Sequence, residues 1–381
     1  MRVLIATVTA GAGHLQAAVA IESAWQTFRP EDQVQRVDML DYVPRLQKAI
    51  LAEGFIKLVN HAPDLWSLVF KKTDNAGLLR KVAGIRHKLA RHANPKFVRH
   101  LKDFQPEIVI STHFMPIEVL GGLREKLPAP APFSACVVTD FEAHALWLEA
   151  GVDLYCVATE ETKASLAARG VDAQCIEVTG IPIADRFSAP MDTDAIRRRN
   201  GLRDDVPVIL ILGGGFGMGP VAELLAETDK LETQFQVIVV AGKNEALRRE
   251  LAGQNRRHPT DVLGFVTNMQ ELMAVADLII TKPGGLTTSE ALALGKPMFI
   301  LNPIPGQEAA NSDFLLEHGA ATKVNRIEDV PYRLELLLGS KKLQDMARTA
   351  KALGRPNAAK DVCQATFRQW QARPDNSKTN T

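Results

Sequence analysis

The sequence has no long apolar run. An α-helix needs roughly 20 apolar residues to cross a bilayer, and no segment of the 381 residues approaches that length. The apolar start at 3–6 is too short for a secretory signal and leads directly into a glycine turn. We therefore expect a chain that does not span a membrane and that stays in the cytoplasm.

The sequence is also poor in cysteine. Its four cysteines show neither CxxC nor Cys/His spacing; Cys136, Cys156 and Cys175 sit in apolar runs, and Cys363 stands alone. This pattern argues against a disulfide framework or a zinc site and predicts reduced, buried thiols. Net charge is nearly absent as well, +1 from 45 basic and 44 acidic side chains, so the local distribution of charge is the informative one.

Short apolar runs alternate with amphipathic segments along the whole chain, which is typical of parallel strands joined by crossover helices. At ~150 residues per domain, 381 residues predict two such α/β domains. Strands are expected at 3–7, 34–38, 108–111, 133–139, 154–158 and 175–178, and again at 206–212, 235–241, 278–281 and 298–301. The series predicts two doubly wound, Rossmann-like sheets.

The boundary is placed near residue 185, after the segment TGIPI and before a polar connection. The predicted organisation is one domain at 1–185, a second at 186–355, a C-terminal helix at 356–372 and a disordered tail at 373–381. Open α/β sheets bind ligands at the carboxyl ends of their strands, so two of them facing each other would form a cleft. The loops that follow strands are therefore the candidate sites.

Two loops of the first domain carry candidate side chains. In TAGAGH, small residues including Gly13 leave room for another molecule, and His14 begins a helix where a neutral imidazole can take a proton from a hydroxyl. In VVTDFEAHALW, Asp140, His144 and Trp147 could line the acceptor side. A plain packing turn and structural roles for the histidines are the alternatives, because a lone histidine is more often structural.

A glycine-rich loop opens the second domain. The segment GGGFGMGP has five glycines in seven residues directly after a strand, with Gly214, Gly215 and Gly217 at its centre. A backbone without Cβ atoms can direct its N–H groups at phosphate oxygens, so phosphate binding is favoured over a bare tight turn. A Walker loop is excluded because no Gly-Lys-Ser/Thr ending follows.

The segment TKPGGLTTSE again has strand, glycine turn and helix. Gly285 lies in the turn, the amides of Leu286 and Thr287 would face phosphates, and Glu290 could accept both hydroxyls of a ribose. Thr287 and Glu290 also have capping-box spacing, which predicts a helix that satisfies its own donors. The two interpretations are compatible.

Two further loops of the second domain suit a nucleotide sugar. In NPIPGQE, two prolines stiffen a loop that could hold Gln307 and Glu308 toward sugar hydroxyls, unless Glu308 simply begins a helix. In GFVTNMQ, Phe265 and Val266 precede a helix, and an exposed turn there could hold a flat base, although a buried Phe265 fits equally well.

A basic segment lies at 71–102, where ten Lys and Arg face a single acid, Asp74. Apolar and aromatic residues precede it: Phe55, Leu58, Val59, Leu65, Trp66, Leu68, Val69 and Phe70. Cations beside apolar side chains suit an anionic bilayer, whereas a solvated helix or a nucleic-acid surface are the alternatives. The residues predicted to dock on the membrane are Trp66, Phe70, Lys71, Lys72, Arg80, Lys81, Arg86 and Lys88.

Taken in order, the motifs TAGAGH, VVTDFEAHALW, TGIPI, GGGFGMGP, GFVTNMQEL, TKPGGLTTSEALALGKP and IPGQEAAN resemble those of monogalactosyldiacylglycerol synthases and processive diacylglycerol glucosyltransferases, in glycosyltransferase family 28 with MurG. The resemblance spans about residues 1–325. It implies the GT-B fold, with two Rossmann-like domains and a cleft, inversion at the anomeric carbon, and no cofactor or metal for the chemistry.

The resemblance also implies roles for individual residues. His14 would be the catalytic base, Phe265 and Val266 would contact uracil, and Glu290 would bind the ribose. The phosphates would lie at Gly215 and Thr287, and the sugar at Gln307 and Glu308. The first domain would bind diacylglycerol and dock on the anionic inner face of the cell membrane as a peripheral protein, with no role for nucleic acid.

The implied activity is transfer of a hexose from a UDP-sugar to diacylglycerol, which yields a β-glycosyldiacylglycerol. Glucose, galactose and glucuronate stay open as the sugar, because side-chain placement reads an epimeric hydroxyl or a carboxylate. The alternatives are a MurG-like enzyme with another lipid acceptor, a UDP-sugar epimerase of the same architecture, and a silent lipid- or nucleotide-binding protein. The PGQE loop and the basic segment argue against the last two.

Overall fold

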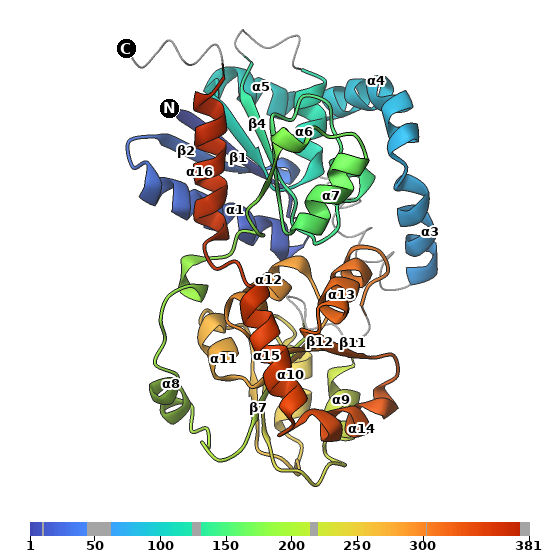
Figure 1. Ribbon diagram of the computed structural model, residues 1–381, viewed down its shortest axis with the longest axis vertical. Helices are drawn as coiled ribbons and strands as arrows, with labels where there is room; N and C mark the ends of the chain where they lie inside the picture. The colour runs from blue at the N-terminus through green and yellow to red at the C-terminus, as the bar shows by residue number, and fades with distance from the viewer. Residues whose placement is uncertain (10, 44–61, 124–130, 214–219, 302, 374–381) are drawn as a thin grey trace. The chain divides into compact units, whose positions relative to one another are not determined.

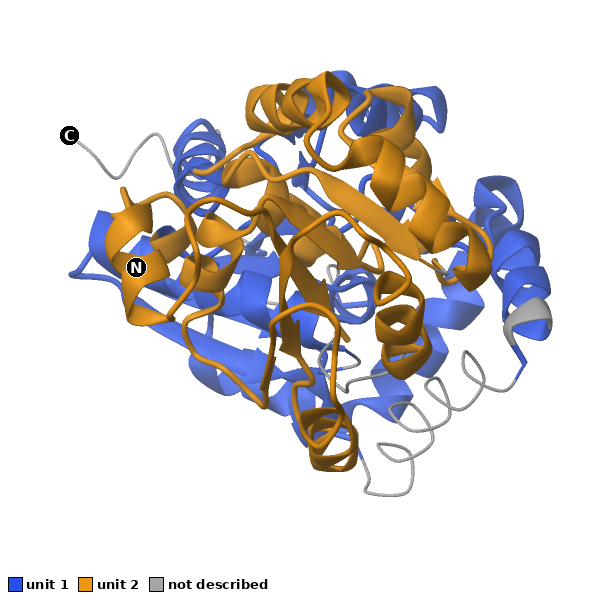
Figure 2. Ribbon diagram, turned by 90° about the horizontal axis from the view of Figure 1, so that it is seen from below, with its two compact units in different colours: residues 1–185, 305–307, 357–381 blue, residues 186–304, 308–356 orange. Residues whose placement is uncertain are grey.

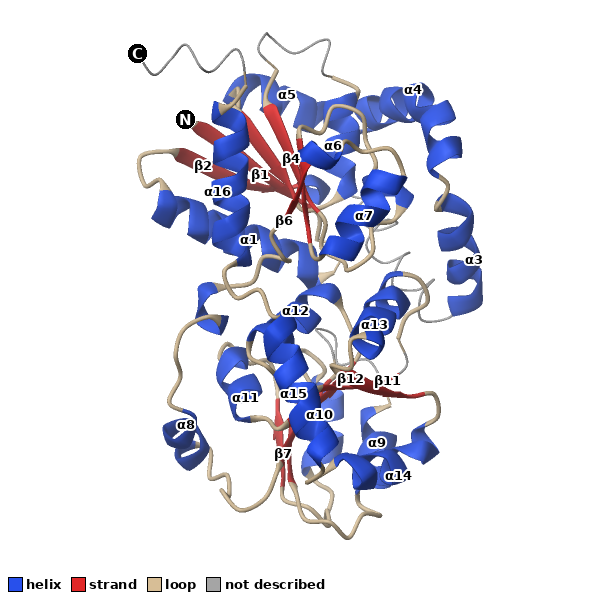
Figure 3. Ribbon diagram, in the orientation of Figure 1, coloured by secondary structure: helices blue, strands red, loops and turns tan. Residues whose placement is uncertain are grey.

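The computed structural model describes residues 1–9, 11–43, 62–123, 131–213, 220–301 and 303–373 (Figure 1). The chain forms two compact units, which Figure 2 colours separately. Unit 1 comprises residues 1–185, 305–307 and 357–381, and unit 2 comprises residues 186–304 and 308–356. Each unit is a parallel sheet with helices, as Figure 3 shows, so the predicted α/β class is confirmed.

The sheet of unit 1 has the strand order β2-β1-β3-β4-β5-β6, and every pair is parallel. Its strands are β1 (Arg2–Thr7), β2 (Gln33–Asp38), β3 (Ile108–Ser111), β4 (Phe133–Val137), β5 (Leu154–Val157) and β6 (Ile176–Val178). All six predicted strands are confirmed, with small shifts at their ends. The central strands are apolar along their length because helices cover both faces of a parallel sheet.

Within the described residues, the α-helices of unit 1 are α1 (Ala12–Phe28), α3 (Pro63–Thr73), α4 (Ala76–Ala93), α5 (Pro95–Phe104), α6 (Phe114–Gly121), α7 (Glu160–Ala168) and α16 (Ala358–Gln371). Short 3-10 turns lie at Met39–Asp41, Ala145–Trp147 and Ala173–Cys175. The last helix, α16, packs against α1 near the other end of the chain, where the thiol of Cys363 contacts the carbonyl of Ile21. The C-terminal helix is therefore part of unit 1.

The sheet of unit 2 has the order β12-β11-β10-β7-β8-β9, again all parallel. Its strands are β7 (Val208–Leu212), β8 (Gln236–Val240), β9 (Thr260–Leu263), β10 (Leu278–Thr281), β11 (Met298–Leu301) and β12 (Ala321–Val324). The four predicted strands are confirmed. The sequence analysis missed β9 and β12, which form the two edges of the sheet and are partly exposed, so neither has a continuous apolar run.

The α-helices of unit 2 are α8 (Thr193–Arg199), α9 (Val221–Thr228), α10 (Glu245–Ala252), α11 (Met269–Val275), α12 (Gly285–Ala293), α13 (Gln307–Glu317), α14 (Val330–Leu337) and α15 (Lys341–Leu353). Two 3-10 turns lie at Asp185–Phe187 and Ile327–Asp329. Buried aromatics such as Phe235 and Phe299 fill the core between this sheet and its helices.

The four cysteines all have free thiols. Cys136, Cys156 and Cys363 are buried as predicted, and burial raises the pKa of each thiol, whereas Cys175 is only half-buried. In the described ranges, no helix has both the length and the apolar character that crossing a bilayer requires.

Arg373, the first residue of the predicted C-terminal tail, makes side-chain contacts with unit 1. The guanidinium of Arg373 pairs with the carboxylate of Asp153 at 2.9 Å and donates to the carbonyl of Ala131 at 2.9 Å, so this residue is anchored on unit 1. The rest of the predicted tail, 374–381, lies outside the described residues.

Candidate functional site

His14 lies in the first turn of α1, directly after strand β1. The turn is made by Gly11, whose φ of 144° favours glycine because an L side chain is strained there. The helix then begins at Ala12, which places Gly13 and His14 at the carboxyl edge of the sheet. The position predicted for a catalytic base is thus at the end of the sheet where α/β proteins bind ligands.

The imidazole of His14 is held through one nitrogen. Its Nδ1 lies 2.8 Å from the carbonyl oxygen of Thr112 and 2.9 Å from the hydroxyl of Thr139. A carbonyl oxygen only accepts hydrogen bonds, so Nδ1 carries the proton and Nε2 carries the lone pair. Within the described part of the chain, no hydrogen bond occupies Nε2.

Burial lowers the pKa of His14 to about 4, although the hydrogen bond with Thr112 opposes the shift. A second imidazole, His113, lies edge-on to it with ring centroids 4.8 Å apart. Burial lowers the pKa of His113 well below its ordinary value, and the charge of His14 adds to the shift. Both rings are therefore neutral near pH 7, and His14 is unprotonated at Nε2, as a general base must be.

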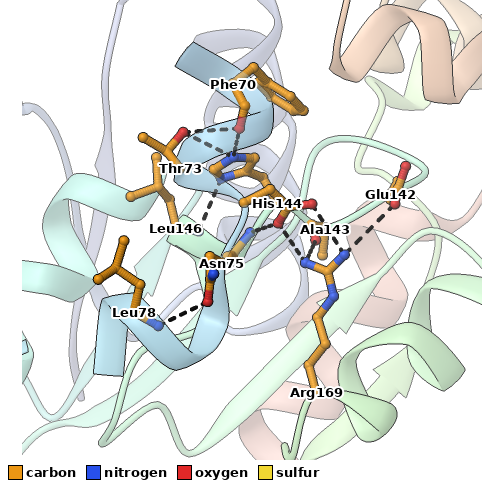
Figure 4. Close-up of polar contacts among 11 residues, drawn as sticks. Phe70, Thr73, Asn75, Leu78, Glu142, Ala143, His144, Leu146 and Arg169 are labelled. Carbon is orange, nitrogen blue, oxygen red and sulfur yellow. Dashed lines mark hydrogen bonds and ion pairs between the residues drawn. The ribbon is translucent and has the colours of Figure 1, made fainter. Parts of the chain in front are cut away.

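The three residues predicted to line the acceptor side, Asp140, His144 and Trp147, lie in different environments. Trp147 is buried in the core of unit 1, with its ring 6.3 Å from that of His14, and Asp140 is partly buried. His144 is buried and uses both ring nitrogens: Nδ1 accepts from the amide of Leu146 at 3.1 Å, and Nε2 donates to the carbonyl of Phe70 at 3.0 Å (Figure 4).

His144 belongs to a cluster that we call the elbow, where α3 ends and α4 begins. The elbow comprises the contacts of Phe70, Thr73 and Asp74 with His144, Ala145 and Arg169. Asp74 accepts from the guanidinium of Arg169 at 2.7 Å and from the amide of Ala145 at 2.8 Å. Burial alone would raise the pKa of Asp74, but these hydrogen bonds outweigh it and the pKa is lowered.

Helices α3 and α4 carry the predicted membrane-docking residues. Lys71, Lys72, Lys81 and Lys88 are exposed as a docking surface requires. Arg86 instead pairs with the carboxylate of Glu118 on α6 at 3.0 Å.

The other predicted docking residues also make contacts within unit 1. The side chain of Arg80 donates to the carbonyl of Arg169. The ring of Phe70 packs against the imidazole of His144 at 4.4 Å, and Trp66 is half-buried.

Each of these two helices also has an exposed apolar stripe. The apolar residues of the α3 stripe were named in the sequence analysis, whereas those of the α4 stripe were not. The stripes are Leu65, Leu68 and Val69 with Lys72 on α3, and Leu78, Ile85 and Leu89 with Lys81 and Lys88 on α4. The spacing of three and four residues places each set on one helix face. Ile85 is 66% exposed and Leu89 65%, which is unusual for aliphatic side chains of a packed helix. Phe55, Leu58 and Val59 lie outside the described residues.

In unit 2, a pocket lies at the carboxyl ends of β7 and β10. The residues that line it include Gly213, Thr281 and Lys282, together with apolar residues of α9. Lys282 is a cation that the sequence analysis left unassigned, and its place directly after a strand was the signal. Gly214, Gly215 and Gly217 lie outside the described residues.

The helix after β10 begins earlier than predicted. α12 starts at Gly285, and its N-cap is Gly284, which has no side chain to accept from the helix. Thr287 is therefore the third helical residue, and the capping-box prediction is wrong. The amides of Leu286 and Thr287 stay in the first turn, where backbone donors are available for an anion.

Glu290 lies one turn further along α12. Burial raises its pKa to about 8, although the charge of Arg186 opposes the shift. The carboxyl group is therefore mostly neutral at pH 7, able both to donate and to accept hydrogen bonds. Arg186, which lies shortly after the segment TGIPI, is close enough for its positive charge to act on the carboxyl group of Glu290.

The remaining donor-side residues lie in two loops. Phe265 is 70% exposed, which excludes a buried ring and leaves its face available, and Val266 is half-buried. Gln307 begins α13, and the carboxylate of Glu308 accepts from the amide of Ile304 at 2.7 Å. Burial raises the pKa of Glu308. Among residues of described structure, no cluster of three or more His, Cys, Asp or Glu could hold a metal ion.

Two family models match the chain. Residues 14–183 match monogalactosyldiacylglycerol (MGDG) synthase, and residues 208–362 match the glycosyltransferase family 28 C-terminal domain. A processive diacylglycerol beta-glucosyltransferase of Bacillus cereus is 32% identical over 98% of this chain and 95% of its own length. The enzyme of that name from Bacillus pumilus is 36% identical over 69% of each chain.

Solved structures share the fold. MurG from Acinetobacter baumannii has a TM-score of 0.63 at 18% identity and covers 96% of this chain and 99% of its own. Anabaena HepE in complex with UDP-glucose has a TM-score of 0.53 at 15% identity, with coverage of 97% and 98%. The architecture is thus GT-B. The chain belongs to the glycosyltransferase family 28 enzymes that include the monogalactosyldiacylglycerol synthases and the processive diacylglycerol β-glucosyltransferases.

Proposed function

We propose that this enzyme moves a glucosyl residue from UDP-glucose to diacylglycerol with inversion and so makes a β-glucosyldiacylglycerol membrane lipid. The observation that carries the proposal is the neutral imidazole of His14 at the carboxyl edge of the sheet of unit 1, oriented through Nδ1, with Nε2 hydrogen-bonded to none of the described residues. The name that the Bacillus relatives share supports both glucose and diacylglycerol.

In the proposed reaction, Nε2 of His14 takes the proton of the acceptor hydroxyl while its oxygen attacks the anomeric carbon. The new carbon–oxygen bond forms as the bond from the anomeric carbon to the diphosphate breaks, and UDP leaves with the electron pair. Attack on the face opposite the leaving group converts an α-linked donor into a β-glycoside. A base placed in this way typically contributes 10²- to 10⁴-fold to the rate.

Unit 2 takes the donor in this proposal. The first-turn amides of α12 and the ammonium of Lys282 supply positive charge for the diphosphate, so the step needs no metal or other cofactor. The exposed ring of Phe265, with Val266, stacks on the uracil, and Glu290 binds the ribose. Gly214, Gly215 and Gly217 extend the phosphate site, and Gln307 with Glu308 reads the sugar.

Unit 1 docks on the anionic inner face of the cell membrane as a peripheral protein. The apolar stripes of α3 and α4 enter the headgroup region, while Lys72, Lys81 and Lys88 meet anionic lipid, each cation contributing ~1 kcal/mol. The stripes replace Arg86 as the docking element, because its charge is already paired with Glu118. Gly13, Asp140 and Trp147 stay the predicted acceptor-side residues.

The test is product analysis by thin-layer chromatography and mass spectrometry. Purified protein is incubated with diacylglycerol in phosphatidylglycerol-containing vesicles and, in separate reactions, with UDP-glucose, UDP-galactose or UDP-glucuronate. We expect a hexosyl lipid with UDP-glucose only. A product with UDP-galactose alone would change the sugar, conversion of UDP-sugar without acceptor would favour an epimerase, and no turnover of any donor would overturn the proposal.

A further inference from the structure

The contacts of His14 with buried threonines suggest how this base is held in the reactive form. Three threonines end or follow three neighbouring strands, β1, β3 and β4, and all are buried: Thr7, Thr112 and Thr139. The sequence analysis assigned a role to none of them. Together they form what we call the threonine cradle.

Thr112 fixes both the main chain and the ring of His14. Its hydroxyl is hydrogen-bonded with the carbonyl of His14 at 3.0 Å and with the hydroxyl of Thr7 at 2.9 Å. Its own carbonyl oxygen faces Nδ1 at 2.8 Å. The helix turn that carries His14 and the tautomer of its ring are thus set by one residue at the end of a central strand.

Thr139 completes the environment of Nδ1. Its hydroxyl oxygen lies 2.9 Å from this nitrogen, and since Nδ1 already carries the proton, the oxygen is an acceptor. When Nε2 takes a proton in the reaction, the ring becomes an imidazolium with its charge partly on Nδ1–H. The oxygens of Thr112 and Thr139 are then the groups that stabilise this charge, and both are uncharged.

We propose that Thr139 is a positioning residue for the reaction, which orients the Nδ1-protonated ring of His14 together with Thr112 and stabilises the imidazolium formed during transfer. The role rests on the proposed use of His14 as the base. A carboxylate in this place would hold the ring protonated to higher pH. Two neutral oxygens instead keep it an unprotonated base in the resting enzyme and still orient it.

The kinetic test compares Thr139→Val, which keeps the shape and removes the hydroxyl, with Thr139→Ser, which restores it. We expect Thr139→Val to lower kcat roughly 10- to 100-fold, the effect of losing one hydrogen bond to a charged group. KM for UDP-glucose should be unchanged, the acid limb of the pH profile should move to lower pH, and Thr139→Ser should recover most of the activity. The matched control is Thr228→Val in unit 2, which also loses one buried hydroxyl bond, to Leu225.

The second measurement needs no turnover. Nitrogen-15 NMR of the histidine-labelled enzyme reports which ring nitrogen carries the proton, and His14→Ala assigns the signal among the nine histidines. We expect an Nδ1-protonated, neutral His14 at pH 7. Thr139→Val should leave the fold intact and broaden or shift that signal.

The outcomes separate this inference from the proposed function. An Nε2-protonated His14 in the wild type would overturn the inference, as would a Thr139→Val enzyme with unchanged kcat and pH profile. If Thr139→Val fails to fold, the wild-type tautomer and the Thr139→Ser profile still decide. Absence of any glycolipid product would remove the proposed function while the tautomer measurement would stand.

Discussion

Two histidines of unit 1, His14 and His144, use their rings in opposite ways. His14 donates through Nδ1 to the carbonyl of Thr112, and no residue of the described ranges hydrogen-bonds with its Nε2. His144 accepts through Nδ1 from the amide of Leu146 and donates through Nε2 to the carbonyl of Phe70 (Figure 4). The first ring has a lone pair to offer a substrate, and the second has both nitrogens engaged by the protein.

A histidine in a loop that follows a strand is therefore identified as a base by the hydrogen-bond partners of its ring nitrogens, and not by its position in the sequence. Both residues follow strands of one sheet, and the sequence analysis gave each a candidate role. We propose that His14, held by the threonine cradle, acts as the base. The contacts of His144 in the elbow instead attach helix α3 to the rest of unit 1. The two regions should therefore fail in different assays.

The largest effect is expected from the base itself. His14→Ala should lower kcat by about 10²- to 10⁴-fold, the typical contribution of a general base, since the threonine cradle has no substitute for it. Binding of UDP and of vesicles should not change, measured by calorimetry and by sedimentation with liposomes. His144→Ala should cost less than about tenfold, and a loss as large as that of His14→Ala would break the comparison.

A smaller effect, in another assay, should follow from charging the apolar stripes. Ile85→Glu with Leu89→Glu should weaken binding to phosphatidylglycerol vesicles by roughly 10- to 100-fold, because two apolar side chains no longer enter the bilayer and two negative charges are added. Turnover of a short-chain, water-soluble diacylglycerol should be unchanged. The control is Leu336→Glu in unit 2, also more than half exposed. Equal loss in that variant would show that the stripes are no docking surface.

Loss of an elbow contact should lower the free energy of unfolding. Arg169→Met removes the partner of the Asp74 carboxylate, and a hydrogen bond to a charged group is worth about 1.5–3 kcal/mol. Because both side chains are about a quarter exposed, we expect the lower end of that range in the free energy of unfolding by urea. Lysine at this position should recover part of the loss. A fully stable Arg169→Met enzyme would mean that the elbow does not hold α3.

The smallest expected effect is the change in kcat/KM between pH 7 and pH 5.5, which would be large for a histidine of ordinary pKa. With a pKa of about 4, His14 stays unprotonated as the pH falls from 7 to 5.5, so kcat/KM for diacylglycerol at saturating donor should fall less than about twofold. A histidine at its usual pKa of about 6.5 would lose about tenfold over the same range. An acid limb near pH 6.5 in this profile would contradict the burial that we describe for the ring.

Much of the architecture could be predicted from sequence, because central parallel strands are continuous apolar runs. The edge strands β9 and β12 escaped, since their partly exposed faces interrupt the pattern. The capping box predicted at Thr287 is wrong because the helix begins three residues earlier, after Gly284, so the spacing rule was applied to the wrong first turn.

The sequence predicted which residues belong to the site better than it predicted their hydrogen bonds and protonation states. His14 and Glu290 were identified from loops that follow strands, but their neutral states arise from burial that a sequence does not display. Neither Thr112 nor Thr139 received a role from the sequence, because a threonine at the end of a strand is common and indicates no function by itself. Only the pairing of β1, β3 and β4 brings them to one imidazole.

The central claim is a single displacement on diacylglycerol, with the acceptor deprotonated by His14. The most direct test is the anomeric configuration of the glycolipid made by the wild-type enzyme from UDP-glucose, read from the anomeric proton coupling in its NMR spectrum. The account predicts the β-glycoside alone. An α-glycoside, or a mixture of the two anomers, would contradict it.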